Sequence, residues 1–210
     1  MLLDIENRMQ DYEIDYAGLL SKVSDADIET KIAFLTEELP HEFHEQYLLM
    51  MPRITYLWRY SVKGFEYIYD LYSELEKKGL VPYRPTAESR VVGVLGRSQR
   101  TSEQRDTSRL QGWVGQTEKC FGENTDKGHF IAHTIGGGLE VNIFAQRRDI
   151  NRGWSKRGKI FRSMEKYCAR HPNTFCFNRP LYSDDTSRPY MIEFGVLIES
   201  GDLWVERFDN

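Results

Sequence analysis

The sequence predicts an α+β fold in which a helical amino-terminal module, residues 1–85, precedes a domain with an antiparallel sheet, residues 86–210. Two observations indicate this division. Apolar residues recur at helical intervals before residue 80 and in short, strand-like runs after residue 90. Residues 1–90 contain ten basic and seventeen acidic groups, a net charge of −7, whereas residues 91–210 contain eighteen and fifteen, a net charge of +3.

The first module is expected to consist of two or three amphipathic helices. Asp25 and Asp27 suit a helix N-terminus, Pro40 and Pro52 are expected to break helices, and Gly79 is expected to close the last helix. The aromatic-rich residues 56–72 are included in this helical region, because apolar side chains recur there at intervals of three and four. This run is interpreted as the core of a small bundle or, alternatively, as a docking face for a partner or a second subunit.

Residues 82–90 contain two prolines and several polar residues, which predicts a linker and places the domain boundary there. After the linker, the order of elements is expected to be strand, loop, strand, strand, helix and three further antiparallel strands. The expected strands and strand-like segments are residues 90–97, 128–135, 139–146, 175–182, 189–199 and 203–209; the expected loop is 98–109, and the expected helix is 154–171.

Basic residues are concentrated in one segment of this second domain. Between residues 147 and 170 there are nine basic residues and only two acidic ones, a local net charge of +7. Such a run is by default a solvated helix surface, but it also forms a field that attracts phosphate. The basic residues are Arg147, Arg148, Arg152, Lys156, Arg157, Lys159, Arg162, Lys166 and Arg170.

The amino terminus carries acidic residues where a secretory signal requires basic ones, and no run of eighteen apolar residues occurs. We therefore expect a protein without membrane partners that is cytoplasmic or delivered without a cleaved signal. Cys120, Cys168 and Cys176 lack zinc-site spacing, which favours free thiols over a disulfide between Cys168 and Cys176.

The segment from Asp126 to Arg162 contains the residue types that phosphodiester hydrolysis requires. His129 is a candidate general base, because imidazole is largely neutral at physiological pH. Asn142, Gln146 and Asn151 supply amide oxygens, which are hard neutral ligands that magnesium accepts. The basic run supplies cations for phosphate contacts.

This segment resembles the DNA/RNA nonspecific endonuclease family, the ββα-metal (His-Me finger) nucleases that include the Serratia nuclease. Residues 126–129, DKGH, correspond to the family's DRGH motif, and the spacing of Asn142, Gln146 and Asn151 agrees with the family pattern. Residues 179–182, RPLY, resemble the family's GPLY. The resemblance spans residues 120–185 and implies a ββα-metal domain that cleaves DNA and RNA with Mg²⁺, for which Mn²⁺ can substitute.

The resemblance also implies a role for each matching residue. His129 would act as the base, with Asn142 and Glu165 completing the catalytic set, and Asn151 would be the direct ligand of a hydrated magnesium ion. The implied phosphate contacts are Lys127, Arg152 and Arg162, and the implied supporting residues are Asp126 and Gln146.

The chain departs from the family pattern at several positions. Lys127 replaces an arginine and loses its bidentate fork. Ala145 replaces a proline, and Trp154 comes one residue early. The family's metal-water glutamate falls at Gly158, so Glu165, two helical turns further along, is the nearest acid. The family's upstream arginine has five candidates, which are Arg90, Arg97, Arg100, Arg105 and Arg109.

Together these observations predict a magnesium-dependent, sugar-nonspecific endonuclease. Backbone contacts carry little sequence information, and binding to them weakens as salt rises. Such an enzyme endangers its own cell, which is consistent with a bacterial toxin or antiphage effector whose first module binds an inhibitor or activator or forms a homo-oligomer. Two alternatives remain: a noncatalytic nucleic-acid-binding protein on a degenerate nuclease scaffold, and a protein-binding module whose basic run contacts an acidic partner.

Overall fold

The computed structural model describes residues 13–51, 55–101, 104, 106–111, 115–116 and 121–210. A six-stranded antiparallel sheet has the order β1-β2-β3-β6-β7-β8, and a second sheet pairs β4 with β5. The strands are β1 Leu57–Val62, β2 Phe65–Asp70, β3 Arg90–Arg97, β4 Thr125–His129, β5 Ile143–Arg147, β6 Phe175–Leu181, β7 Met191–Leu197 and β8 Leu203–Asp209. The α-helices are α2 Tyr16–Ser21, α3 Ile28–Met50, α4 Tyr72–Lys77, α5 Thr107–Gln111, α6 Arg148–Asn151 and α7 Lys156–Arg170, and 3₁₀ turns span His133–Ile135 and Glu140–Asn142.

This arrangement confirms the predicted α+β class of helices with an antiparallel sheet. The helix and the strands predicted after residue 140 are also observed, with shifted ends. The segment predicted as strand over 128–135 is strand only as far as His129 and then forms a turn. The predictions for Pro52, Arg105 and Cys120 concern positions outside the described residues.

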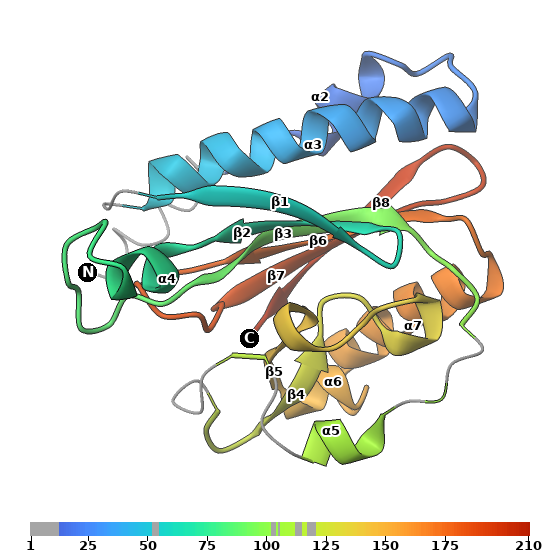
Figure 1. Cartoon of the computed structure of the whole chain (residues 1–210). Coiled ribbons are helices and arrows are strands. Elements are labelled where there is room, and N and C mark those ends of the chain that lie inside the picture. The colour runs from blue at the N-terminus through green and yellow to red at the C-terminus, as the bar shows by residue number, and fades with distance from the viewer. Residues whose placement is uncertain (1–12, 52–54, 102–103, 105, 112–114, 117–120) are drawn as a thin grey trace.

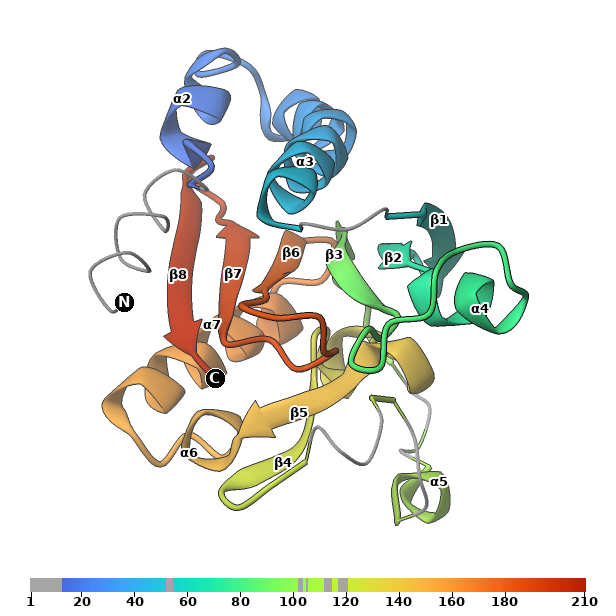
Figure 2. The same ribbon diagram turned by 90° about the vertical axis from the view of Figure 1, so that its left-hand side faces the viewer.

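Helices α2 and α3 cover one face of the large sheet (Figures 1 and 2). The N-terminus of α3 is capped by Asp27, whose side chain accepts a hydrogen bond from the Thr30 amide at 2.7 Å, as expected for an acid at this position. Pro40 lies inside α3, so the predicted helix break is wrong. The cost of a proline in a helix, about 3 kcal/mol, is outweighed here because the helix buries one continuous apolar stripe. That stripe consists of Ile32, Leu35, Leu39, Phe43 and Tyr47.

Residues 57–70 form the antiparallel hairpin β1–β2, so the helical prediction for the aromatic-rich run is wrong. The two turn residues, Lys63 and Gly64, have φ values of 49° and 78°. Two consecutive positive φ values are characteristic of a type I′ turn, which matches the twist of a hairpin. The aromatic side chains then pair across strands, as Tyr60 and Tyr67 do with ring centroids 5.6 Å apart.

The opposite face of the large sheet packs against α7 and the small β4–β5 sheet (Figures 1 and 2). Phe161 of α7 lies 5.4 Å from Phe194 and 5.1 Å from Phe208, measured between ring centroids. Met164 and Cys168 continue the buried side of the helix, with spacings of three and four residues. This packing fixes α7, and with it the segment between α6 and α7, against a rigid sheet.

The hydrophobic core clusters of the described residues contain residues from each side of the expected boundary at 85/86. Phe65 packs in the same cluster as Phe194, and Leu39 packs in the same cluster as Phe177. The predicted linker is also packed, since the Tyr72 hydroxyl donates to the Pro82 carbonyl at 2.7 Å. Removal of residues 1–85 would therefore delete two strands of the sheet, and the regulatory role expected for this segment stays a prediction.

Cys168 and Cys176 are buried free thiols, as the sequence predicted. A hydrogen bond with Cys168, together with burial, raises the pKa of Cys176 well above its ordinary value. In the described part of the chain, no helix is long and apolar enough to cross a membrane.

Candidate active site

The predicted site residues lie on and around the small sheet. In the β4–β5 register, Asp126 is opposite Gln146 and His129 is opposite Ile143. The strands are joined by the loop from residue 130 to 142, and the four-residue helix α6 and the longer helix α7 follow.

The outer edge of β5 is closed by side chains rather than by a third strand. The amide of Ala145 donates to Gln116 Oε1 at 2.7 Å, and its carbonyl accepts from Asn210 Nδ2 at 2.8 Å. Asn210 Oδ1 accepts in turn from the amide of Arg147 at 2.8 Å. These bonds provide partners for the backbone groups on the edge of β5 that faces no strand, and they tie the small sheet to the end of β8.

Helix α6 follows β5 directly, and α7 begins after a short connection. The packing of the two helices requires glycine at position 158, in the first turn of α7. A Cβ atom at Gly158 would lie 2.3 Å from the Asp149 carbonyl oxygen and 3.0 Å from the Cα of Gly153. Both neighbours are backbone atoms that cannot rotate away. Glycine at this position therefore permits α6 and α7 to approach closely, and Ser155 caps α7 through the Gly158 amide at 3.0 Å.

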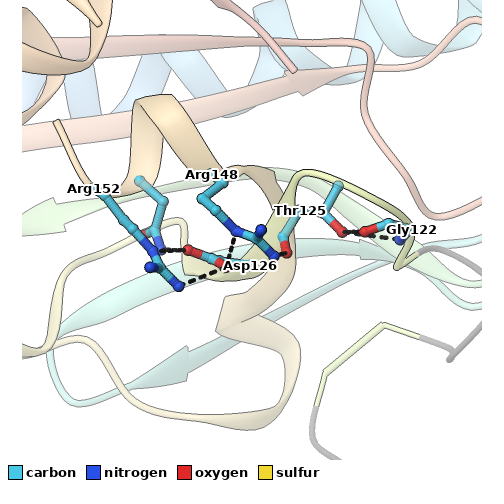
Figure 3. A network of polar contacts seen from close by, with 6 residues as sticks. Gly122, Thr125, Asp126, Arg148 and Arg152 are labelled. Atoms are coloured by element: carbon cyan, nitrogen blue, oxygen red, sulfur yellow. Dashed lines mark hydrogen bonds and ion pairs between the residues drawn. The ribbon is translucent and has the colours of Figure 1, made fainter. Parts of the chain in front are cut away.

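Asp126 is the centre of the polar network in Figure 3. Its Oδ1 accepts from Arg148 Nε at 2.9 Å, and its Oδ2 accepts from Arg152 Nε at 2.6 Å. Burial alone would raise the pKa of Asp126, but hydrogen bonds from Arg152, Arg148 and Asn151 outweigh burial and hold the pKa below its ordinary value. Asp126 is therefore an ionised anchor that holds two guanidinium groups side by side.

Sequence reasoning did not single out Arg148, which completes this anchor. Arg148 and Arg152 are four residues apart at the start and the C-cap of α6, and such pairs lie on the same side of a helical turn. The four-residue spacing indicated that the two arginines lie together, but the carboxylate that they share belongs to Asp126 on β4, which is distant in the sequence.

Asn151 connects Asp126 to the helix α7. Its Nδ2 donates to Asp126 Oδ2 at 3.4 Å, and its carbonyl oxygen accepts from Arg162 at 3.4 Å. Arg162 is also paired with Glu165, with 3.6 Å between Nε and Oε2. The structure thus brings five predicted site residues into one continuous set of contacts, which comprises Asp126, Asn151, Arg152, Arg162 and Glu165.

His129 and Lys127 lie on the same strand and, two residues apart, on the same side of it. His129 ends β4 and exposes 8% of its surface. The Nζ atom of Lys127 donates to the carbonyl oxygen of Leu110 in α5 at 2.8 Å. This contact sets α5 beside the strand that carries the histidine.

Asn142 and Gln146 are buried. The Asn142 side chain accepts from the Ile131 amide at 2.8 Å and donates to the carbonyl oxygens of Ile131 and Gly138 at 2.8 and 2.9 Å. These three bonds close the loop between β4 and β5, so Asn142 positions the loop that follows His129. Gln146 packs over Gly128, and both polar atoms of its amide are buried without a hydrogen-bond partner in the described structure.

The structure narrows the choice of upstream arginine. Arg90 is 1% exposed and lies in the core, and Arg97 pairs with a carboxylate of α3. Arg109 lies on α5, the helix that contacts Lys127, and pairs with the carboxylate of Glu140 on the loop between β4 and β5. The remaining two candidates are Arg100, which is exposed, and Arg105, which is outside the described residues.

The donor set suits a hydrated metal ion held by few protein atoms. Among the described residues, no cluster of three or more His, Cys, Asp or Glu side chains could hold a metal. Within the same residues, the Oδ1 atom of Asn151 receives no hydrogen bond, while its Nδ2 is held by Asp126. An amide oxygen oriented in this way is a hard neutral ligand of the kind that Mg²⁺ accepts while it keeps most of its water.

No protein-family model matches the chain, and no curated protein matches it. Among solved structures, the chain is similar to the crystal structure of NucA from Streptococcus agalactiae with magnesium ion bound, at 16% identity over 76% of this chain and 74% of that chain, with a TM-score of 0.41. It is also similar to the structure of Sda1 nuclease with bound zinc ion, at 15% identity over 75% of this chain and 85% of that chain, with a TM-score of 0.36.

Proposed function

We propose that this protein is a divalent-metal-dependent nuclease that hydrolyses phosphodiester bonds in DNA and RNA without strong sequence preference. One observation carries this function: the contacts that join Asp126, Asn151 and Arg162 around the end of the β4–β5 sheet. The same strand that holds Asp126 ends at His129. These positions support the assignment of the base, metal-ligand and phosphate-binding roles to residues of one small framework.

In the proposed reaction, His129 takes a proton from the attacking water, whose oxygen forms a bond to phosphorus. The bond between phosphorus and the leaving oxygen breaks, and that oxygen takes a proton from solvent. Magnesium, held through Asn151, would supply positive charge against the charge that builds on the phosphate. Lys127, on the same side of β4 as His129, contacts the phosphate.

Three arginines are assigned to the substrate on the basis of their positions. Arg162 is half exposed in the first half of α7 and contacts the backbone of Asn151, so it lies beside the proposed metal ligand. Arg109 is the upstream arginine that the contact between Lys127 and α5 favours. Arg152, predicted from the sequence as a phosphate contact, has half of its side chain exposed even though it binds Asp126.

The test is degradation of supercoiled plasmid and of RNA by the purified chain in magnesium and in EDTA. His129→Ala and Asn151→Ala are expected to abolish degradation, whereas His41→Ala, a change of an exposed histidine on α3, is the matched control and is expected to have no effect. Degradation that persists in EDTA or in His129→Ala contradicts the proposed mechanism.

The limited exposure of His129 favours a second candidate function, a noncatalytic nucleic-acid-binding protein. Glu165, paired with Arg162, is in addition displaced from the family position. This function predicts that plasmid and RNA stay intact under every condition of the degradation assay. It also predicts that the chain binds nucleic acid without metal and that His129→Ala does not change this binding.

A further inference from the structure

Trp154 is a large apolar side chain left on the surface beside the proposed active site. It lies between α6 and α7 and exposes 63% of its surface. Its backbone is fixed, since its amide donates to the Asp149 carbonyl at 2.9 Å. The guanidinium carbon of Arg152 lies 4.9 Å from the centroid of the indole ring. The result is a flat aromatic platform on a rigid backbone, backed by a cation.

A cavity of about 340 Å³ adjoins this platform. It is lined by Asn124, Arg147, Arg148, Asp149 and Trp154. Its volume is at the lower end of roughly 300–1,000 Å³, the usual range for sites that bind small molecules. The space is therefore large enough to hold a flat ring.

The arginines around the cavity are held in place and keep a positive balance. Arg147 binds both oxygens of Asp149 at 3.0 Å, which uses two of its five N–H donors. Arg148 and Arg152 share the carboxylate of Asp126 (Figure 3). Three guanidinium groups thus face two carboxylates, which leaves one net positive charge beside the exposed indole.

An aromatic platform next to fixed guanidinium groups is the combination that binds single-stranded nucleic acid. Each base offers a π face for stacking, and each phosphate offers an acceptor for arginine. Inside a duplex, both faces of each base are covered by neighbouring base pairs, so an internal base can stack on Trp154 only when it is unpaired or flipped out. An acidic peptide would satisfy the arginines but would not use the exposed face of the indole.

We propose that Trp154, Arg147 and Arg148 form a stacking site for one unpaired nucleobase and its phosphate, so that the substrate is single-stranded or locally melted nucleic acid. The assignment of substrate class rests on the proposed nuclease function. The two sites are connected: Arg148 lines the cavity and binds Asp126, whose other oxygen contacts Asn151. A base on Trp154 would therefore belong to a nucleotide close to the cleaved phosphate.

The experiment measures binding, which does not require cleavage. The full chain carrying His129→Ala is titrated in Mg²⁺ at low salt with a short fluorescent single-stranded oligonucleotide and with the matching duplex. Trp154→Ala is added to this background, and Trp58→Ala is the matched control, because Trp58 is a tryptophan on β1 with 60% of its surface exposed. Circular dichroism and thermal unfolding verify that each variant is folded.

We expect Trp154→Ala to weaken single-strand binding about tenfold and to change duplex binding less than about twofold, because only an unpaired base loses its stacking partner. The conservative variant Trp154→Phe keeps an aromatic ring and is expected to recover most of the affinity. One abasic position in the oligonucleotide should lower affinity in the parent chain but not in Trp154→Ala.

Two results would overturn the stacking site: single-strand affinity of Trp154→Ala equal to that of Trp58→Ala, or an equal loss for duplex and single strand. Cleavage by the unsubstituted chain is measured in parallel to separate the two proposals. Cleavage without an effect of Trp154→Ala overturns only the stacking site. Binding that depends on Trp154 without cleavage in any metal overturns only the nuclease.

Discussion

The Nε atom of Arg152 lies 2.6 Å from Oδ2 of Asp126, although the two residues are 26 positions apart in the chain. The contact joins the end of α6 to β4, and Arg148 binds the other oxygen of the same carboxylate at 2.9 Å. Because Asn151 contacts this carboxylate too, the geometry around the proposed metal ligand depends on the charge of Asp126.

Asp126→Asn is expected to lower the free energy of unfolding at pH 7 by about 1–2 kcal/mol, because charge-assisted hydrogen bonds are lost while the half-exposed arginines stay solvated. The folded pKa of Asp126 is lowered, so its contribution is present above the unfolded value of about 3.9 and is lost as the pH falls through the folded pKa. Urea unfolding at neutral and acidic pH checks this. The difference in unfolding free energy between Asp126→Asn and the unsubstituted chain should shrink under acidic conditions. Asp209→Asn changes an exposed residue and is the control, which should show no such shrinkage. A difference for Asp126→Asn that does not depend on pH would contradict the prediction.

Magnesium is expected to stabilise the chain through Asn151. A ligand that binds only the folded state adds about 2.7 kcal/mol at a hundred times its Kd. Thermal unfolding across a Mg²⁺ titration should show a rise that EDTA reverses and that Asn151→Ala removes. Glu37→Gln, a change on the exposed side of α3, should keep the full rise. An equal rise in Asn151→Ala would place the metal elsewhere.

Asn142→Ala is expected to destabilise the fold by about 2–3 kcal/mol, since it leaves the buried Ile131 backbone groups without partners. Asn142→Asp keeps the acceptor for the Ile131 amide but places a buried negative charge against the carbonyl oxygens of Ile131 and Gly138, so at neutral pH it should destabilise the fold at least as much as Asn142→Ala. Urea unfolding ranks the three chains. A variant with normal stability and no activity would show instead that Asn142 takes a direct part in the chemistry.

Gly158→Ala is expected to destabilise the chain. The reverse would be expected from helix propensity alone, which favours alanine over glycine by about 1 kcal/mol. The added methyl group would meet the Asp149 carbonyl oxygen and the Cα of Gly153, and α6 would have to move away from α7. Ser163→Ala, at an exposed position of α7, is the control and should change stability by less than about 0.5 kcal/mol. If Gly158→Ala is more stable than the parent, the close approach does not constrain the site.

Much of the domain after residue 90 was predictable because its elements are determined locally. Helix α7 has apolar residues at helical spacing, and the strands at 175–181, 191–197 and 203–209 are short β-rich runs separated by turns. In each case the pattern favours one structure. The apolar side of α7 packs on the sheet, whereas β6 is buried on both faces.

The aromatic run at 57–70 shows where a local pattern was insufficient. Its apolar residues fit a helical spacing and also fit a hairpin, and the one local signal for the hairpin was the pair Lys63 and Gly64. The choice is made by β3, which pairs Phe65 with Gly96 and Tyr67 with Val94. That partner lies about thirty residues away, so no short window of sequence contains it.

The sequence by itself determined the chemical types of the candidate site: a histidine, amides at a defined spacing and a basic run. Only the tertiary structure decided which of them share contacts. It joins Asp126 to Arg148 and Arg152, and it directs the Asn142 amide into the β4–β5 loop. The physical reason is that a carboxylate or an amide bonds to whichever groups its direction and burial bring within about 3 Å, and those groups come from segments distant in the chain.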